Sequence, residues 1–177
     1  MRIPVFARRA VFAIIFLGSM SLASAQVIPT TNAETLTGKK VTLPDAVRGH
    51  VSIFVVGFSR KSKDPTGDWT KKLRPLYAQD RDLQIYQAAH LQGAPRLIRG
   101  MIVSGMKKGV PPDQQDNFFV LYEAPDDWKR WVNFSEPDDA YIVLVDKAGQ
   151  TVWRTHGPLN DAGINELNKE VQQLESH

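Results

Sequence analysis

The sequence predicts an α/β fold with a central mixed sheet flanked by helices, and three segments predict it. Residues 51–56 form a nearly continuous run of β-branched and aromatic side chains, which is typical of a central strand covered on both faces. Residues 64–77 carry apolar side chains at helical spacing, so a helix is expected to pack on that strand. Residues 141–154 are two strand-like runs joined by a short turn, which predicts a β-hairpin.

The first 25 residues have the parts of a signal peptide. Three arginines precede an apolar run at 11–17, and Ala23-Ser24-Ala25 fits a cleavage site. The apolar run is too short to span a bilayer comfortably. We therefore expect a signal peptide at 1–25, a single domain at 26–177, and a periplasmic or secreted product with no stable membrane span. An uncleaved N-terminal anchor and a twin-arginine signal are the alternatives.

Composition narrows the function classes once this segment is set aside. Removing 25 of the 177 residues leaves 152, with 19 basic and 19 acidic side chains and no net charge. A neutral domain argues against nucleic acid as the main partner. The chain has no cysteine, so packing alone must hold an exported domain together.

The remaining elements follow in order along the chain. Residues 26–33 are polar and predict a loose lead-in. The pair Asp64-Pro65 predicts the start of the first helix, because Asp can cap free backbone N–H groups and Pro fits the first helical position. Pro75 is expected to kink that helix. The further predictions are a strand at 82–88, a helix at 95–106, a strand at 116–123, a short helix or turn at 124–132, and a final helix at 161–174.

Several of these segments together resemble the thioredoxin-like superfamily. The run Gly57-Phe58-Ser59, followed by a turn and a helix with an early Trp69, resembles the junction that carries the redox site in that fold. Residues 141–154 are similar to its late hairpin, and 36–44 to its N-terminal segment. Within the superfamily, the first of these runs looks most like the thioredoxin-like assembly factor of mitochondrial ATP synthase. The resemblance covers most of residues 34–175 and implies the fold and a role in assembly.

The chain departs from the superfamily where the redox chemistry would sit. Depending on the alignment, the Cys-x-x-Cys motif falls on residues 63–66 or 67–70, and neither stretch contains a cysteine. The superfamily also places a cis-proline before the later strand, a position that corresponds here to Ala140, whereas Pro137 lies three residues too early. The sequence therefore predicts no thiol-dependent activity.

Other catalytic and metal-binding patterns are weak. No two of the four histidines have the i, i+4 spacing of a helical metal site, so loop positions are expected for them. The carboxylates Asp126-Asp127 and Asp138-Asp139 are adjacent, so their side chains should point apart and serve turns or caps. Ser59 and Ser62 have no histidine nearby in the sequence. We therefore expect no catalytic residue, no metal and no cofactor.

Two groups of residues remain as candidate binding sites. Arg60, Lys61 and Lys63 precede a helix N-terminus, where cations and free N–H groups can bind a carboxylate or phosphate. Trp128 and Trp131, with Phe134, could form an exposed patch for a partner, but core packing of at least one of the two tryptophans is the favoured interpretation. The first hypothesis is a non-redox binding or assembly factor for an envelope protein. The second is a thiol-independent enzyme or anion-binding protein that uses the basic turn.

Overall fold

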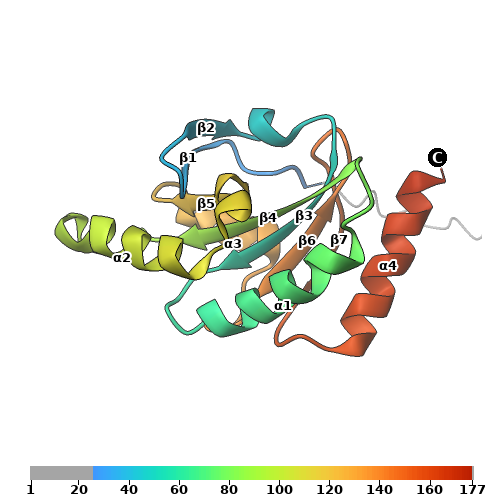
Figure 1. Ribbon diagram of the computed structural model, residues 1–177. Helices are drawn as coiled ribbons and strands as arrows, with labels where there is room; N and C mark the ends of the chain where they lie inside the picture. The colour runs from blue at the N-terminus through green and yellow to red at the C-terminus, as the bar shows by residue number, and fades with distance from the viewer. Residues whose placement is uncertain (1–25, 177) are drawn as a thin grey trace, which may run out of the picture.

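A single mixed sheet of seven strands organises the protein (Figure 1). The computed structural model describes residues 26–176, and the predicted signal peptide lies outside them. The strand order is β2-β1-β5-β4-β3-β6-β7, with β3 parallel to β4 and antiparallel to β6. The strands are β1 (Thr31–Thr35), β2 (Lys40–Leu43), β3 (Val51–Gly57), β4 (Leu83–His90), β5 (Phe118–Leu121), β6 (Tyr141–Val145) and β7 (Thr151–His156). The predicted α/β class is confirmed.

Helices cover both faces of this sheet. One face packs against α1 (Lys63–Leu76) and α4 (Asp161–Glu175), and the other against α3 (Pro125–Val132). A fourth helix, α2 (Arg96–Gly109), lies beside the sheet rather than over it (Figure 1). Short 3-10 helices occupy η1 (Asp45–Val47) and η2 (Pro112–Asn117). None of the helices between residues 26 and 176 combines the length and the apolar composition that a bilayer crossing requires.

The central strand β3 carries the two main cores. All seven of its residues are buried, as its apolar run predicts. Ile53 and Val55 face α1 and α4, where Trp69 and Leu73 are fully buried. Side chains on the alternate positions of β3 face α3 and the N-terminal segment. This alternation explains why a nearly continuous apolar run was required, since both faces of the strand are covered.

Two local predictions need correction. Residues 26–33 are not a loose lead-in, because β1 begins at Thr31 and Ile28 is buried in the core. The helix α1 begins at Lys63, one residue before Asp64-Pro65, and Asp64 lies in its first turn instead of capping it. Pro75 lies inside the last turn of α1, which runs on to Leu76, and the kink expected there stays a prediction.

Candidate functional site

The turn between β3 and α1 lies at the carboxyl end of the central strand. It begins after Gly57, where a side chain has no room. A Cβ atom at this position would lie 2.5 Å from the Oγ atom of Ser62. The glycine therefore lets the chain fold back closely enough for Ser62 to sit buried at the start of α1.

Ser59 is the centre of the hydrogen bonds that close this turn. Its Oγ accepts from the backbone N–H groups of Lys61 at 3.0 Å and Ser62 at 3.1 Å. The same hydroxyl donates to Oδ1 of Asp138 at 2.8 Å. Ser62 returns a bond from its Oγ to the Ser59 carbonyl at 2.8 Å. The hydroxyls of Ser59 and Ser62 and the N–H groups of Lys61 and Ser62 are thus satisfied from within the protein.

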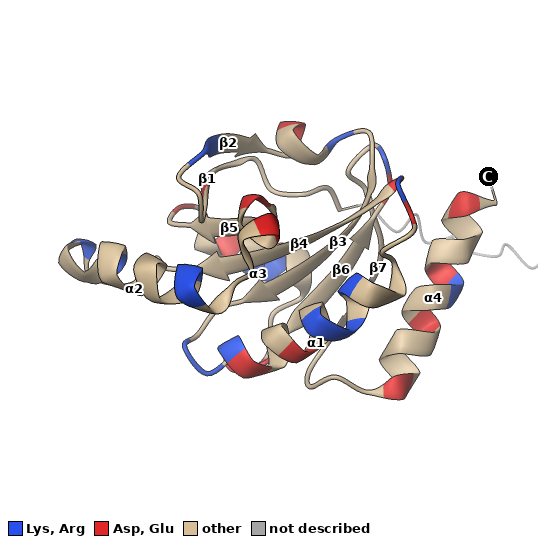
Figure 2. Cartoon of the chain, in the orientation of Figure 1, with Lys and Arg blue, Asp and Glu red and all other residues tan. Residues whose placement is uncertain are grey.

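The three predicted cations lie together on this turn but differ in their partners (Figure 2). Lys61 forms a salt bridge with Asp138, with Nζ 3.3 Å from Oδ2. Arg60 and Lys63 are exposed. The backbone N–H groups of Lys61 and Ser62 bind Ser59, that of Lys63 donates to the Arg60 carbonyl at 3.4 Å, and Pro65 has none. The turn therefore offers positive charge but few free backbone donors to an anion.

Asp138 links the turn to the loop before β6. The hydrogen bond from Ser59, with smaller contributions from Lys61, holds the pKa of the Asp138 carboxyl below its usual value. The side chain of its neighbour Asp139 contacts His156 instead, with Oδ2 lying 2.7 Å from the Nδ1 atom of the imidazole. The two adjacent carboxylates thus do not form a dyad, in agreement with the expectation from their spacing.

The loop before β6 is held by one buried hydroxyl. Tyr141 accepts hydrogen bonds from the backbone N–H groups of Ser135 at 2.9 Å and Glu136 at 2.8 Å, and donates to the Glu136 carbonyl at 2.7 Å. The residue before β6 is the buried Ala140, as expected, and the peptide bond preceding Pro137 is trans. The loop therefore lacks the proline that the superfamily places beside its dithiol.

Aromatic rings line the space between the turn and this loop. Phe58 packs edge-on against Phe134 at 5.1 Å and against Tyr141 at 5.6 Å, and stacks on His90 at 6.0 Å. Phe58 and Phe134 are half-buried, so part of each ring reaches the surface. Burial lowers the pKa of His90, whose Nε2 lies 3.0 Å from the Glu123 carbonyl. His90 ends β4 and is not the loop residue that the sequence suggested.

The two tryptophans pack in the core and form no exposed patch. Trp128 and Trp131 are both buried, and their rings meet edge to face at 5.1 Å on the side of α3 that faces the sheet. Phe54 of β3 contacts both rings, and Trp131 donates from Nε1 to the Thr151 hydroxyl at 2.8 Å. The tryptophans hold α3 to the core and do not reach a partner.

Sequence reasoning missed the partners of the turn. Asp138 lies 79 residues from Ser59, and nothing in the local pattern joins them. Phe58 belongs to the Gly57-Phe58-Ser59 run and Phe134 to the candidate aromatic patch, but nothing in the sequence predicts that the two rings meet. Among residues 26–176, no three His, Asp or Glu side chains converge in a way that could hold a metal ion.

Comparisons with known proteins agree with this architecture. The model of the family described as ATP10 protein matches residues 16–174. No curated protein matches the chain. Similar solved structures include BsSco, of the Sco family of cytochrome c oxidase assembly proteins, with 15% identity and a TM-score of 0.56 over 83% of this chain and 94% of that one.

Two further structures are thiol-disulfide proteins. The thioredoxin domain of a Bacteroides vulgatus oxidoreductase has 22% identity and a TM-score of 0.53, over 84% of this chain and 98% of that one. A thiol:disulfide interchange protein from Chlorobium tepidum has 14% identity and a TM-score of 0.51, over 86% and 97%. These likenesses show a thioredoxin-like fold. The chain therefore belongs to the ATP10 protein family of assembly factors and carries that fold without a cysteine.

Proposed function

We propose that this protein is an exported assembly factor that holds an envelope protein at the turn between β3 and α1, without redox chemistry. Membership of an assembly-factor family supports the class of function. The absence of cysteine from the chain removes the thiolate that disulfide exchange needs. The signal-peptide pattern at 1–25 supports export.

The observation that carries this proposal is the way Ser59 joins two segments into one surface. Its hydroxyl ties the turn to Asp138, so the turn and the loop before β6 are fixed relative to each other. Half-buried Phe58 and Phe134 lie between them, and exposed Arg60 stands at the edge. Aromatic rings bordered by arginine are the side chains enriched where proteins bind proteins.

Site-specific crosslinking tests this proposal. A photoreactive amino acid at Arg60 or Lys63 should give a crosslinked product of defined mass when the full chain is made in its own cell. Arg48 is a matched control, because it is also an exposed arginine and lies before β3, at the opposite end of the strand from the turn. Products at Arg48 equal to those at Arg60, or none at either position of the turn, would argue against a docking surface there.

Export is tested separately. N-terminal sequencing of the protein from its cell should begin at Gln26 if the predicted cleavage after Ala25 occurs. A full-length species retained in the membrane would support the uncleaved anchor instead. This result bears on the compartment and leaves the crosslinking result unchanged.

Anion binding by the same turn is the second candidate. Three cations within four residues favour it, while the Lys61 salt bridge and the occupied N–H groups work against it. Titration calorimetry with inorganic phosphate compares the wild type with a variant in which Arg60, Lys61 and Lys63 are all alanine. Binding that disappears in the variant, while the melting temperature holds, would favour this candidate.

A further inference from the structure

The helix α2 is unlike the other helices of the described chain, because none of its residues is buried. Its C-terminal half contacts the body through Val103 and Met106, which pack partly against Phe118 and Val120 of β5. In its N-terminal half, which extends away from the sheet (Figure 1), the guanidinium of Arg99 lies 4.7 Å from the centre of the Tyr122 ring. The exposed side chains of this half are available to something outside the described chain.

That half exposes large apolar side chains. Leu97 is 98% exposed, Met101 is 70% exposed and Ile98 is 39% exposed. Residues three or four apart are neighbours on a helix surface, and Met101 is four residues after Leu97 and three after Ile98, so the three form one patch around Met101. Contiguous exposed apolar side chains usually mark a place where a protein meets a partner or a membrane.

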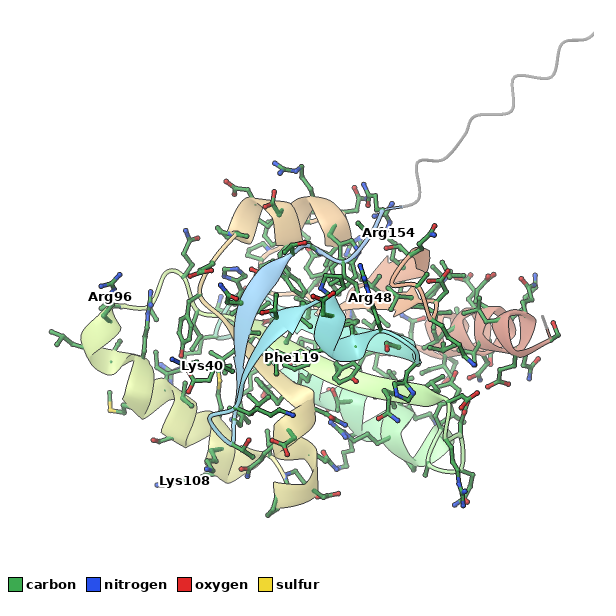
Figure 3. All side chains as sticks on the ribbon, turned by 90° about the horizontal axis from the view of Figure 1, so that it is seen from above. Lys40, Arg48, Arg96, Lys108, Phe119 and Arg154 are labelled. Carbon is green, nitrogen blue, oxygen red and sulfur yellow. The ribbon has the colours of Figure 1, made fainter. Side chains whose placement is uncertain are left out.

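The same helix is strongly basic. Arg96, Arg99, Lys107 and Lys108 lie on it, and the segment 96–110 contains no Asp or Glu. Figure 2 shows blue but no red along α2, and Figure 3 shows Arg96 and Lys108 near its two ends. Setting these four cations aside leaves 15 basic and 19 acidic side chains in the rest of residues 26–177. A positive helix thus projects from an otherwise acidic domain.

The positive charge of α2 and the small size of its apolar patch indicate which kind of surface could cover Leu97, Ile98 and Met101. A second copy of α2 would bring two sets of four cations together, and three apolar side chains are far fewer than the 20–30 residues a side of a stable protein interface. Residues 1–25 are also positive, with three arginines and no carboxylate. An anionic surface that accepts shallow apolar insertion complements both properties of the helix.

We propose that α2 binds the surface of a membrane that contains anionic phospholipid. Leu97, Ile98 and Met101 would enter the boundary between headgroups and acyl chains, and the exposed cations Arg96, Lys107 and Lys108 would lie against lipid phosphates. The N-terminal half of α2 projects beyond the sheet (Figure 1), so these side chains are presented outside the body of the domain.

This inference goes beyond the proposed function and concerns a different element. The helix α2 and the docking turn are nevertheless close in the fold. The helix α2 follows the carboxyl end of β4, the turn at Ser59 follows the carboxyl end of β3, and these two strands are adjacent and parallel. Both surfaces therefore lie at the same edge of the sheet. A protein bound through α2 would hold the candidate docking turn close to the bilayer.

The cysteine-free chain allows a local test. Met101→Cys and the control Gln173→Cys, an exposed position on α4, each give a full-length protein with a single thiol for an environment-sensitive fluorophore. With vesicles of phosphatidylcholine and phosphatidylglycerol, the label at 101 should shift to the blue and brighten, and the label at 173 should not. Vesicles of phosphatidylcholine alone should give a much smaller response.

Charge variants identify which cations act. In the protein labelled at 101, replacing Lys107 and Lys108 by glutamine should weaken vesicle binding by about fivefold per charge. The matched control replaces Lys71 and Lys72, an adjacent exposed pair on α1, and should bind as before. Equal weakening by both pairs, or equal responses at 101 and 173, would overturn the assignment. No response at 101 to anionic vesicles, together with a crosslink from that position to a protein, would assign the patch to a protein partner instead.

Discussion

Removing one buried hydroxyl should loosen the loop that carries Asp138. Tyr141→Phe keeps the ring that stacks on Phe134 but deletes the oxygen that serves three backbone groups of Ser135 and Glu136. Each such bond contributes a net stability of about 0.5–1.5 kcal/mol. Both loop residues are exposed, so water can replace part of the loss. We expect the free energy of unfolding to fall by about 2 kcal/mol and Tm by about 4–8 °C.

Tyr86→Phe is the matched control for this measurement. Tyr86 is also buried and stacks on Phe119 at 5.1 Å, yet its hydroxyl forms no hydrogen bond with the described residues. Its loss should change the free energy of unfolding by less than about 0.5 kcal/mol. Urea unfolding followed by circular dichroism gives both values, and amide exchange reports on residues 135 and 136 directly. Equal losses in the two variants, or unchanged exchange in Tyr141→Phe, would refute the role assigned to the hydroxyl.

Four other outcomes are expected. Gly163→Ala should destabilise the fold by about 1–3 kcal/mol, because the new Cβ would lie 2.9 Å from the buried ring of Trp69. Gly67→Ala, in open space on α1, should instead stabilise the fold by up to about 1 kcal/mol. Denaturant unfolding measures both changes. Ser59→Ala should raise the pKa of Asp138 toward its usual 3.8 in an NMR titration. Because the pKa of Asp138 is lowered in the folded protein, its carboxylate stabilises the fold at pH values above the usual pKa, and this stabilisation is lost as the pH falls through the lowered pKa. Asp138→Asn should therefore be less stable than the wild type above the usual pKa and equally stable below the lowered pKa. A stability difference between the two proteins that does not change at acid pH would contradict this. Insulin reduction and peroxide consumption should stay at buffer levels, and turnover by purified protein would contradict the thiol-free assignment.

The sequence predicts most of the sheet because apolar patterning dictates it. The continuous run of β3, the alternation of β4 and the spacing of α4 each match a buried face that the structure contains. The strand β1 escaped prediction because its buried positions are Thr31, Ala33 and Thr35, which are small or polar and give no apolar signal. Its pairing with β5 determines its place in the sheet, and pairing partners distant in sequence leave no local pattern.

Contacts between residues that are distant in sequence also form the candidate site, and the sequence does not predict them. Charge density located the turn at Arg60 and Lys61, but the hydrogen bond between Ser59 and Asp138 depends on how β3 and β6 bring their ends together. For the two tryptophans, the local pattern is present but does not determine whether the side chains are buried. A spacing of i, i+3 places Trp128 and Trp131 on one face of a short helix without saying whether that face meets the sheet or water.

The position of Gln26 bears on the cleavage proposed after Ala25. Its carbonyl accepts from the N–H of Thr151 at 2.8 Å, and Val27 pairs with Gln150, so the described chain begins beside the start of β7. The turn at Ser59 lies near the end of that strand, where His156 pairs with Tyr141. If export and cleavage occur as proposed, an uncleaved leader would be attached at Gln26, at the far end of the strand from the turn. The precursor would then already present the proposed docking surface before cleavage.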